Sequence, residues 1–351
     1  MAHPVRIFKY PTTGPEDTSP LQRLKDEEGF DAEEVMAVVG KSEGNGCVND
    51  FSRTLSSAVW HPLIPSTSIA IFSGGTEGVL CPHVTFLVKE KEGASTGLVA
   101  MAGRTRLFSP EEVGTETQVR EVEKTVKGMM DQASLTPADV ALILVKCPLL
   151  TSFKIASIRA KGLTPVTTDT YDSMAKSRFA TALGIAVALE EMEGTAEEVA
   201  AGLKSDGEKW SAKASCSSGA ELDDCQIMLL ANAPGEEVKS TGGKTRLRAV
   251  SSFMKDAIDA DSLLSLLSPI RAQSGRVLQV FVKAEASPSG LIRSNRHTMS
   301  TDSDVHSTRH ARAAVGGLIA GLTGDTAVYV SGGAEGQGPP GGGSLTVVYE
   351  V

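Results

Sequence analysis

Short apolar runs recur along the chain, and three of them end in a lysine. The segments are VMAVVGKSEG, ALILVKCPLL and LQVFVKAEAS, which reach Lys41, Lys146 and Lys283. Runs of this length, bounded by polar residues and rich in β-branched side chains, predict buried strands. Helix-like stretches precede the second and third runs, REVEKTVKGMMDQAS and SSFMKDAIDADSLLSLL. The pattern therefore predicts α/β units whose strands are largely covered.

A second strand-like run in each region ends in a serine followed by small residues. These runs are IAIFSGGTEGV at Ser73, SAKASCSSGAEL at Ser217 and AVYVSGGAEGQ at Ser331, with the shared pattern Ser-[Gly/Ser]-Gly-[Thr/Ala]-Glu. Another strand-like run follows each of them, VTFLVKE, QIMLLANA or LTVVYEV. Ser218 replaces the glycine of the other two copies, so the sequence leaves Ser217 and Ser218 open as the functional hydroxyl.

Between lysine and serine, each region carries an arginine at the head of a helix-like stretch. The stretches are SRTLSSAVW with Arg53, SRFATALGIAVALEEM with Arg178, and TRHARAAVGGLIAGL with Arg309 or Arg312. The order Lys, Arg, Ser thus occurs three times, which indicates internal repeats. We place the units at residues 1–104, 111–246 and 250–351, joined by the polar connectors GRTRLFSPEE and GEEVKSTGGKTRLR.

Composition narrows the class of protein. With 41% hydrophobic and 22% charged residues, the 351-residue chain is typical of globular proteins with more than one core. Its net charge of -9 argues against nucleic acid or an anionic membrane as the main partner. The five scattered cysteines favour a reducing compartment. No apolar stretch approaches the roughly 18 residues of a membrane span, and no signal peptide is evident, so we expect a cytoplasmic protein.

The recurring residues suit the hydrolysis of an amide, which needs a nucleophile, a base and donors for the oxyanion. A buried, neutral lysine can act as the base for a serine. Lowering a lysine pKa from about 10.4 to near 7 requires a penalty of about 4–5 kcal/mol on the charged form. Glycines let backbone N–H groups approach a carbonyl, and arginines supply paired donors. Three such sets around a pseudo-threefold axis suit a small planar ring with several carbonyls.

The surroundings predicted for the three lysines differ. Residues two apart on a strand share a face. Lys41 is followed at that spacing by Glu43 and Lys283 by Glu285, whereas Lys146 has no carboxylate there. A carboxylate favours the charged ammonium. We therefore expect Lys146 to have the most apolar surroundings and to be the easiest lysine to keep neutral.

Three further motifs carry weaker signals. Residues 336–341 fit GxGxxG, but they contain Pro-Pro and precede a strand-like segment, unlike a dinucleotide-binding turn. Gly243-Lys244-Thr245 resembles the end of a P-loop but lacks the earlier glycine and a preceding strand. His306 and His310 could ligate a metal from one helix face, but no third ligand accompanies them.

Taken together, the motifs resemble the cyanuric acid hydrolase and barbiturase family. The resemblance rests on Lys41, Ser73-Gly-Gly-Thr-Glu, Lys146, Ser217-Ser-Gly, Lys283 and Ser331-Gly-Gly-Ala-Glu-Gly-Gln-Gly-Pro-Pro-Gly-Gly-Gly, and it extends over essentially the whole chain. It implies a barrel-like α/β fold of three pseudo-threefold-related units, equivalent to a single-chain trimer. It also implies that the middle serine-lysine pair is catalytic and that the protein is a homotetramer.

The resemblance implies a role for each site residue. Lys146 would be the base and Ser217 the nucleophile. The ring would be held by Arg53, Arg178, Arg312, Ser73, Gly74, Ser217, Ser218, Ser331, Gly332, Lys41 and Lys283, and Thr308 would tune substrate choice. A structural Mg²⁺ or Ca²⁺, which prefer oxygen ligands, would be bound by Glu285, Ala334, Gln337, Gly338, Pro339 and Gly342. No organic cofactor is expected.

The leading interpretation is the hydrolysis of cyanuric acid through an acyl-enzyme, giving carboxybiuret, which loses CO₂ to form biuret. Barbiturase activity is the alternative within the same class. Three near-equivalent Arg and Ser sets favour cyanuric acid, whose three edges are identical, over barbiturate. A non-catalytic protein that binds cyclic imides is the alternative from another class, and binding without loss of the ring's ultraviolet absorbance would favour it.

Overall fold

The computed structural model describes residues 2–91, 95–200, 209–235 and 246–351. The helices within these ranges are α1 (Ser19–Arg23), α2 (Phe51–Trp60), α3 (Glu116–Ala133), α4 (Ser152–Ala160), α5 (Thr170–Ala188), α6 (Ala196–Ala200), α7 (Ala260–Ala272) and α8 (Ser307–Thr323). The strands are β1 (His3–Pro11), β2 (Val35–Ser42), β3 (Ile69–Gly74), β4 (His83–Lys89), β5 (Leu98–Arg104), β6 (Val140–Pro148), β7 (Ala214–Gly219), β8 (Gln226–Asn232), β9 (Leu247–Met254), β10 (Arg276–Ala284), β11 (Leu291–Ile292), β12 (Asn295–Arg296), β13 (Tyr329–Gly332) and β14 (Gly343–Glu350).

The long strands form three four-stranded sets with one common order. The first set runs β3-β2-β4-β1, the second β7-β6-β8-β5 and the third β13-β10-β14-β9. The first two sets join through β1 and β5 into one eight-stranded sheet. In every set the lysine strand pairs in parallel with the serine strand. A parallel pair needs a crossover, and the arginine-bearing helices α2, α5 and α8 provide it.

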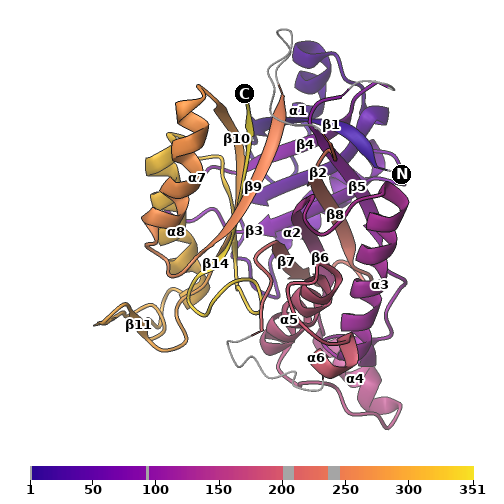
Figure 1. The fold of residues 1–351 in the computed structure, drawn as a ribbon. Coiled ribbons are helices and arrows are strands. Elements are labelled where there is room, and N and C mark those ends of the chain that lie inside the picture. Colours follow the sequence, from indigo (N-terminus) through magenta and orange to yellow (C-terminus); the bar gives the residue numbers. More distant parts are fainter. Residues whose placement is uncertain (1, 92–94, 201–208, 236–245) are drawn as a thin grey trace.

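The cores follow the same threefold plan. Each set has an outer core beneath its own helices, and Figure 1 shows α7 and α8 outside the third set and α3 outside the second. A further core in the centre takes residues from all three sets. Val39, Leu144 and Phe281 belong to this central core, and each lies two residues before its lysine. The lysines therefore point from their strands toward the common centre.

Helix α5 carries Arg178 and lies close against its neighbour α3. A Cβ atom at Gly184 would lie 2.5 Å from the carbonyl oxygen of Val119, so only glycine permits this approach. Small and apolar residues fill the rest of the helix, and most of them are buried. The small-residue pattern in the sequence thus reflects a helix that is buried nearly all round.

The first strand of each set, β1, β5 or β9, was not predicted from the sequence. The stretch SSFMKDAIDADSLLSLL was predicted to be helical, but its residues 251–254 form part of β9 and α7 begins only at Ala260. β5 lies at the end of the predicted first unit, yet it pairs with β8 of the second set. Pairing with distant strands overrides local periodicity in these segments. Gly243-Lys244-Thr245 lies outside the described residues.

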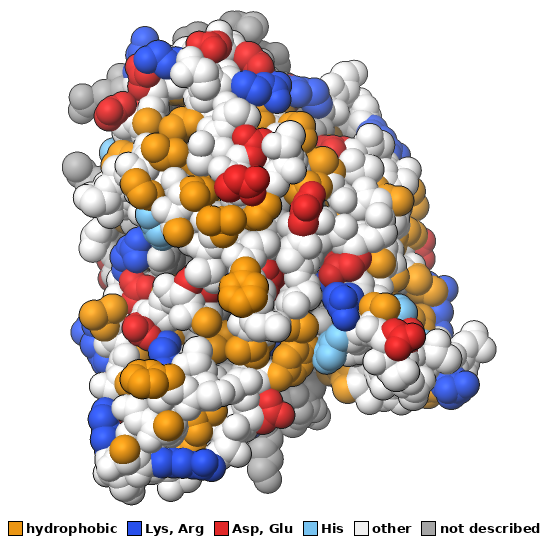
Figure 2. Space-filling view, turned by 180° about the vertical axis from the view of Figure 1, so that it is seen from behind, with side chains coloured by type: hydrophobic (Ala, Val, Ile, Leu, Met, Phe, Trp, Pro, Cys, Tyr) orange, Lys and Arg blue, Asp and Glu red, His pale blue; other side chains and the backbone are white. Residues whose placement is uncertain are grey.

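The described surface carries mixed charges. Figure 2 shows one face of the molecule, where Lys and Arg lie among Asp and Glu with hydrophobic side chains between them. This face offers no extended basic surface of the kind that binds a phosphate backbone. Among the described residues, no helix is long and apolar enough to cross a membrane.

Candidate active site

Three lysine-serine pairs occupy equivalent places in the three sets. Directly opposite each other in the parallel ladders lie Lys41 and Ser73, Lys146 and Ser217, and Lys283 and Ser331. The lysine side chains are buried, with 1%, 2% and 0% of their residue surfaces exposed. All three pairs point to the common centre, where the strand ends of the three units meet.

A small cavity lies where the pairs converge. It is lined by Gly46, Arg53, Ser73, Gly74, Lys146, Met174, Arg178, Ser217, Ser218, Arg312, Ser331 and Gly332. Lys41 and Lys283 do not line it but contact two of its serines. The residues that the sequence predicts to hold a ring thus either line the cavity or, for these two lysines, lie directly behind its serines.

Two of the three lysines bind their own serines. Lys41 Nζ donates to Ser73 Oγ at 3.2 Å, and Lys283 Nζ donates to Ser331 Oγ at 3.0 Å. The two serine hydroxyls also lie 3.3 Å apart, with Ser73 as the donor. These two pairs form one connected hydrogen-bond network on one side of the cavity.

The middle pair is different. Lys146 Nζ donates to the carbonyl oxygen of Phe72 at 2.7 Å and lies 3.2 Å from Glu221 Oε1. Ser217 Oγ is buried and has no hydrogen-bond partner among the described residues. Ser218 Oγ, in contrast, accepts from Arg178 and donates to the Met174 carbonyl, both at 3.3 Å. Of the two serines left open by the sequence, Ser217 is therefore the one whose hydroxyl has no hydrogen-bond partner among the described residues.

Burial lowers the pKa of all three lysines. For Lys283, burial and the neighbouring Arg178 lower the pKa to about 7. For Lys41, burial and then Arg312 bring the pKa well below its ordinary value. The pKa of Lys146 is also lowered by burial, but the Glu221 carboxylate raises it in part. Burial therefore supplies the penalty on the charged form that a lysine base requires.

The prediction that Lys146 has the most apolar surroundings is wrong. Strands β2 and β10 end at Ser42 and Ala284, one residue before the carboxylates expected beside the other two lysines. Glu43 is exposed, and Glu285 instead accepts a hydrogen bond from the Gly341 amide at 3.0 Å. Lys146, in contrast, has a carboxylate 3.2 Å away, that of Glu221 in the serine motif of the middle unit.

Each arginine pairs with the glutamate of a serine motif from another set. The pairs are Arg312 with Glu77 at 2.7 Å, Arg178 with Glu335 at 2.7 Å and Arg53 with Glu221 at 3.7 Å. The three ion pairs therefore link the units in a closed ring. A Cβ atom at Gly75 would lie 2.5 Å from the Arg312 guanidinium, and one at Gly333 would lie 2.5 Å from that of Arg178. Both positions therefore require glycine. These glutamates belong to the serine motif in the sequence, but the motif does not indicate their partners.

Tyr329 is a second buried group near the lysine-serine pairs that the sequence motifs did not indicate. Its ring lies 5.8 Å from Lys41 Nζ, and its buried hydroxyl has no hydrogen-bond partner among the described residues. Burial raises the pKa of Tyr329, while the Ser217 and Ser73 hydroxyls, which lie near its hydroxyl without meeting hydrogen-bond geometry, act in the opposite direction. A tyrosine two residues before Ser331, on the same strand face, was the signal that could have indicated it.

Comparison with known proteins gives the family. The profile described as amidohydrolase ring-opening protein matches residues 6–350. A cyanuric acid amidohydrolase from a Sarocladium species is 56% identical over 348 residues, 99% of each chain. Another, from a Rhodococcus species, is 53% identical over 348 residues, 98% of this chain and 95% of its relative. This chain belongs to the ring-opening amidohydrolase family.

Solved structures of this amidohydrolase family share the fold. A cyanuric acid hydrolase described as an evolutionary innovation by structural concatenation superposes with a TM-score of 0.89 at 39% identity, covering 100% of both chains. The crystal structure of the cyanuric acid hydrolase from A. caulinodans gives a TM-score of 0.88 at 38% identity, covering 99% of both. The family resemblance and the α/β fold class predicted from the sequence are thereby confirmed.

The central cavity of this amidohydrolase is lined by Arg312 and not by Arg309. Arg312 has 2% of its surface exposed and lines the cavity. Arg309 lies outside the lining, where its Nη2 donates to the Asp304 carbonyl at 3.5 Å. Thr308 lies at the edge of the cavity. A Cβ atom placed on Gly332, which lines the cavity, would be 3.4 Å from the Cβ atom of Thr308.

The two histidines of α8 have other partners. His306 accepts at the start of the helix from the Thr308 amide and lies 3.2 Å from the Tyr171 hydroxyl. His310 lies 2.9 Å from Asp302. Neither contact joins the two histidines to a third ligand, and no group of three or more His, Cys, Asp or Glu residues suited to a metal occurs among the described residues.

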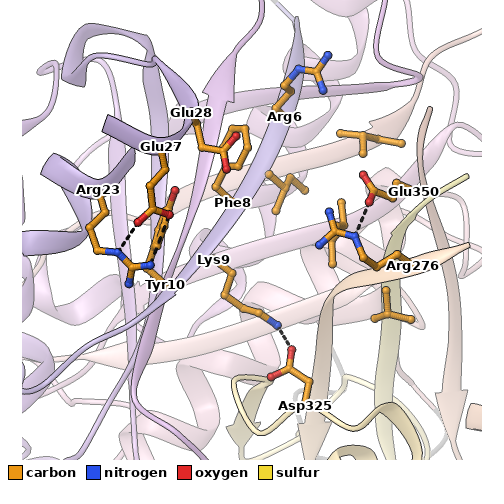
Figure 3. A pocket seen from close by; sticks show the side chains of 14 residues that line it. Arg6, Phe8, Lys9, Tyr10, Arg23, Glu27, Glu28, Arg276, Asp325 and Glu350 are labelled. Atoms are coloured by element: carbon orange, nitrogen blue, oxygen red, sulfur yellow. Dashed lines mark hydrogen bonds and ion pairs between the residues drawn. The ribbon is translucent and has the colours of Figure 1, made fainter. Parts of the chain in front are cut away.

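A separate hollow of about 440 Å³ lies between the first and third sets of this amidohydrolase. Figure 3 shows its charged lining, which contains none of the serine-lysine pairs. Its four basic residues pair with carboxylates, as Arg6 with Glu90, Lys9 with Asp325, Arg23 with Glu27 and Arg276 with Glu350. These pairings leave no unpaired basic side chain among the residues that line the hollow.

Proposed function

We propose that this amidohydrolase opens the ring of cyanuric acid. Relatives that share 56% and 53% of their residues over nearly the whole chain carry that activity in their names. The observation that carries the proposal is the convergence of three register-matched lysine-serine pairs, of which only the middle serine has a free hydroxyl. Three equivalent sets match a ring with three equivalent edges.

In the proposed reaction, Ser217 Oγ attacks one ring carbonyl and its proton passes to neutral Lys146. The resulting tetrahedral oxyanion needs donors, which backbone N–H groups and the site arginines can supply. Collapse of this intermediate breaks the C–N bond, and Lys146 returns the proton to the leaving nitrogen. Water then hydrolyses the acyl-enzyme to carboxybiuret, which loses CO₂ to give biuret. Lys146 must turn from the Phe72 carbonyl toward Ser217 for the first transfer.

The other two pairs would bind the ring rather than react with it. Lys41 and Lys283 already donate to Ser73 and Ser331, so these serines can orient their own protons toward ring carbonyls. A neutral lysine keeps N–H donors, so lowered lysine pKa values do not remove this role. The role of Arg53, Arg178 and Arg312 would be to contact the three ring edges with charge-assisted hydrogen bonds.

The proposed function is tested by comparing substrates. Purified protein is supplied with cyanuric acid and, separately, with barbituric acid, and loss of each ring is followed by ultraviolet absorbance. We expect kcat/KM for cyanuric acid to exceed that for barbituric acid by at least about a hundredfold, since the loss of one equivalent edge costs several kcal/mol of binding. Comparable or reversed values would identify a barbiturase, and binding of cyanuric acid without turnover would identify a cyclic-imide binding protein.

We also propose that Glu285 and the turn formed by residues 334–342 hold a structural Mg²⁺ or Ca²⁺. Burial and the neighbouring Glu335 carboxylate raise the pKa of Glu285 to about 7, and a cation would relieve this repulsion. Glu285 lies against the turn through the Gly341 amide. Gln337 is fully buried in that turn, and its side chain accepts from the Cys216 amide. Carbonyls of Ala334, Gln337, Gly338, Pro339 and Gly342 would complete the oxygen ligands.

Glu285→Ala should lower the melting temperature by about 5 °C in Mg²⁺ or Ca²⁺ because it removes the one carboxylate ligand. EDTA should lower the melting temperature of the wild type and leave that of the variant unchanged. Glu43→Ala is the matched control, because Glu43 occupies the equivalent sequence position in the first unit and is exposed. Equal metal content and melting temperature in Glu285→Ala and wild type would show that the ion does not bind here.

A further inference from the structure

The middle serine motif ends differently from the other two. β3 and β13 stop at Gly74 and Gly332, and the next glycines, Gly75 and Gly333, adopt φ values of +98° and +77°. β7 continues one residue further, through Gly219, which still pairs with Pro148 of β6. The chain after the middle serine therefore leaves its strand one residue later and in another direction.

This difference changes what the motif glutamate contacts. Glu77 and Glu335 each accept two hydrogen bonds from an arginine guanidinium. The Glu221 carboxylate instead lies over Gly219, where a Cβ atom would overlap it. It stands 3.7 Å from Arg53 Nε and 3.2 Å from Lys146 Nζ.

Of the three site lysines, Lys146 alone has an ion pair with a carboxylate among the described residues. Within the described ranges, Lys41 and Lys283 form no ion pair with a carboxylate closer than 4 Å. Glu221 is also the most buried of the three motif glutamates, with 9% of its side chain exposed against 19% for Glu77 and 20% for Glu335. A buried carboxylate interacts more strongly with a neighbouring charge than an exposed one does. The middle unit therefore combines two features: the Ser217 hydroxyl has no partner among the described residues, and the Glu221 carboxylate contacts Lys146.

We propose that Glu221 is a positioning residue for Lys146, so that Ser217, Lys146 and Glu221 form a triad. This inference rests on the proposed function. When Ser217 attacks the ring carbonyl, its proton moves to Lys146 Nζ and creates an ammonium, which the Glu221 carboxylate stabilises. The proton then passes from Nζ to the leaving ring nitrogen as the C–N bond breaks. The third member of a serine triad plays the same part, orienting the base and stabilising its charged form.

Glu221→Gln tests the inference through the pH dependence of kcat/KM. The groups that face Lys146 are Glu221, Arg53 and Asp50. The active form of Lys146 is neutral, so activity rises as pH increases through its pKa. Removing the Glu221 charge leaves burial and Arg53, which lower the pKa of Lys146. The acid limb of the profile, where kcat/KM rises with pH, should therefore move to lower pH. We expect kcat to fall at least about tenfold, because the ammonium formed in the reaction loses its partner.

Glu77→Gln is the matched control. It removes the equivalent carboxylate of the first unit, which binds Arg312 and not a lysine. It should raise KM and leave the acid limb in place. An acid limb that stays in place in Glu221→Gln as well would overturn the inference and leave Glu221 as a partner of Arg53 alone.

Glu221→Asp is the second variant, for use if Glu221→Gln does not fold, as judged by thermal unfolding. It keeps the charge but withdraws the carboxylate from Lys146, so the acid limb should move in the same direction by a smaller amount, and an unmoved limb contradicts the inference. Activity in Ser217→Ala would instead overturn the proposed function. If Ser217→Ala is inactive and neither Glu221 variant moves the acid limb of the kcat/KM profile, only the proposed role of Glu221 is wrong.

Discussion

Ser217→Ala is expected to abolish turnover of cyanuric acid and to preserve its binding. The Ser217 hydroxyl is buried, has no partner among the described residues, and lies directly opposite Lys146 in the ladder. Its removal takes away the proposed nucleophile without breaking a hydrogen bond described for the free protein. We expect turnover to fall by about a thousandfold or more, as for other nucleophiles that act with a base. Ultraviolet absorbance measures turnover, and titration calorimetry measures binding.

The serines of the other two pairs provide matched controls for this result. Ser73 and Ser331 accept hydrogen bonds from Lys41 and Lys283, so their replacement by alanine should weaken binding of the ring and leave measurable turnover. Near-wild-type turnover in Ser217→Ala, together with loss of turnover in Ser73→Ala or Ser331→Ala, would place the nucleophile in another unit.

Arg312→Ala should raise KM for cyanuric acid about 10- to 150-fold. A charge-assisted hydrogen bond contributes about 1.5–3 kcal/mol, and each 1.36 kcal/mol corresponds to a factor of ten. Loss of the guanidinium also leaves Glu77 without its partner, so the melting temperature should fall as well. Steady-state kinetics and thermal unfolding measure the two effects separately.

Arg309→Ala is the matched control, since Arg309 lies on the same helix three residues earlier. Its guanidinium donates to the Asp304 carbonyl, and Arg309 does not line the cavity. KM and melting temperature should therefore stay close to those of the wild type. A null effect for Arg312→Ala together with a raised KM for Arg309→Ala would transfer the ring contact to Arg309.

Much of the fold was predictable because its signals are local. The apolar runs before Lys41, Lys146 and Lys283 are strands buried on both faces, which is what continuous apolar sequence indicates. The arginine-bearing stretches are helices of two kinds. Apolar residues recur with helical period in α2 and α8, whereas α5 is small and apolar nearly all round. The first strand of each set has no comparable local signal, since it is defined by its pairing with a distant strand.

The site could be predicted only in part. Repetition of lysine, arginine and serine identified the groups that line the cavity, because each is delivered by its own repeat. The ion pairs between arginines and glutamates could not be predicted, because every pair joins two different units. Lys146 could not be set apart by the lack of a neighbouring carboxylate, because strands β2 and β10 end at Ser42 and Ala284, before the glutamates that follow Lys41 and Lys283.

The sequence by itself determined that three similar units each deliver a lysine, an arginine and a serine to one place. Only the tertiary structure decided how these groups differ. Arg309 and Arg312 lie three residues apart on α8, which packs against β13, and only Arg312 reaches the cavity. Likewise, one additional residue of pairing between β6 and β7 directs Glu221 toward Lys146. Such choices depend on contacts between segments far apart in the chain, which local sequence patterns do not contain.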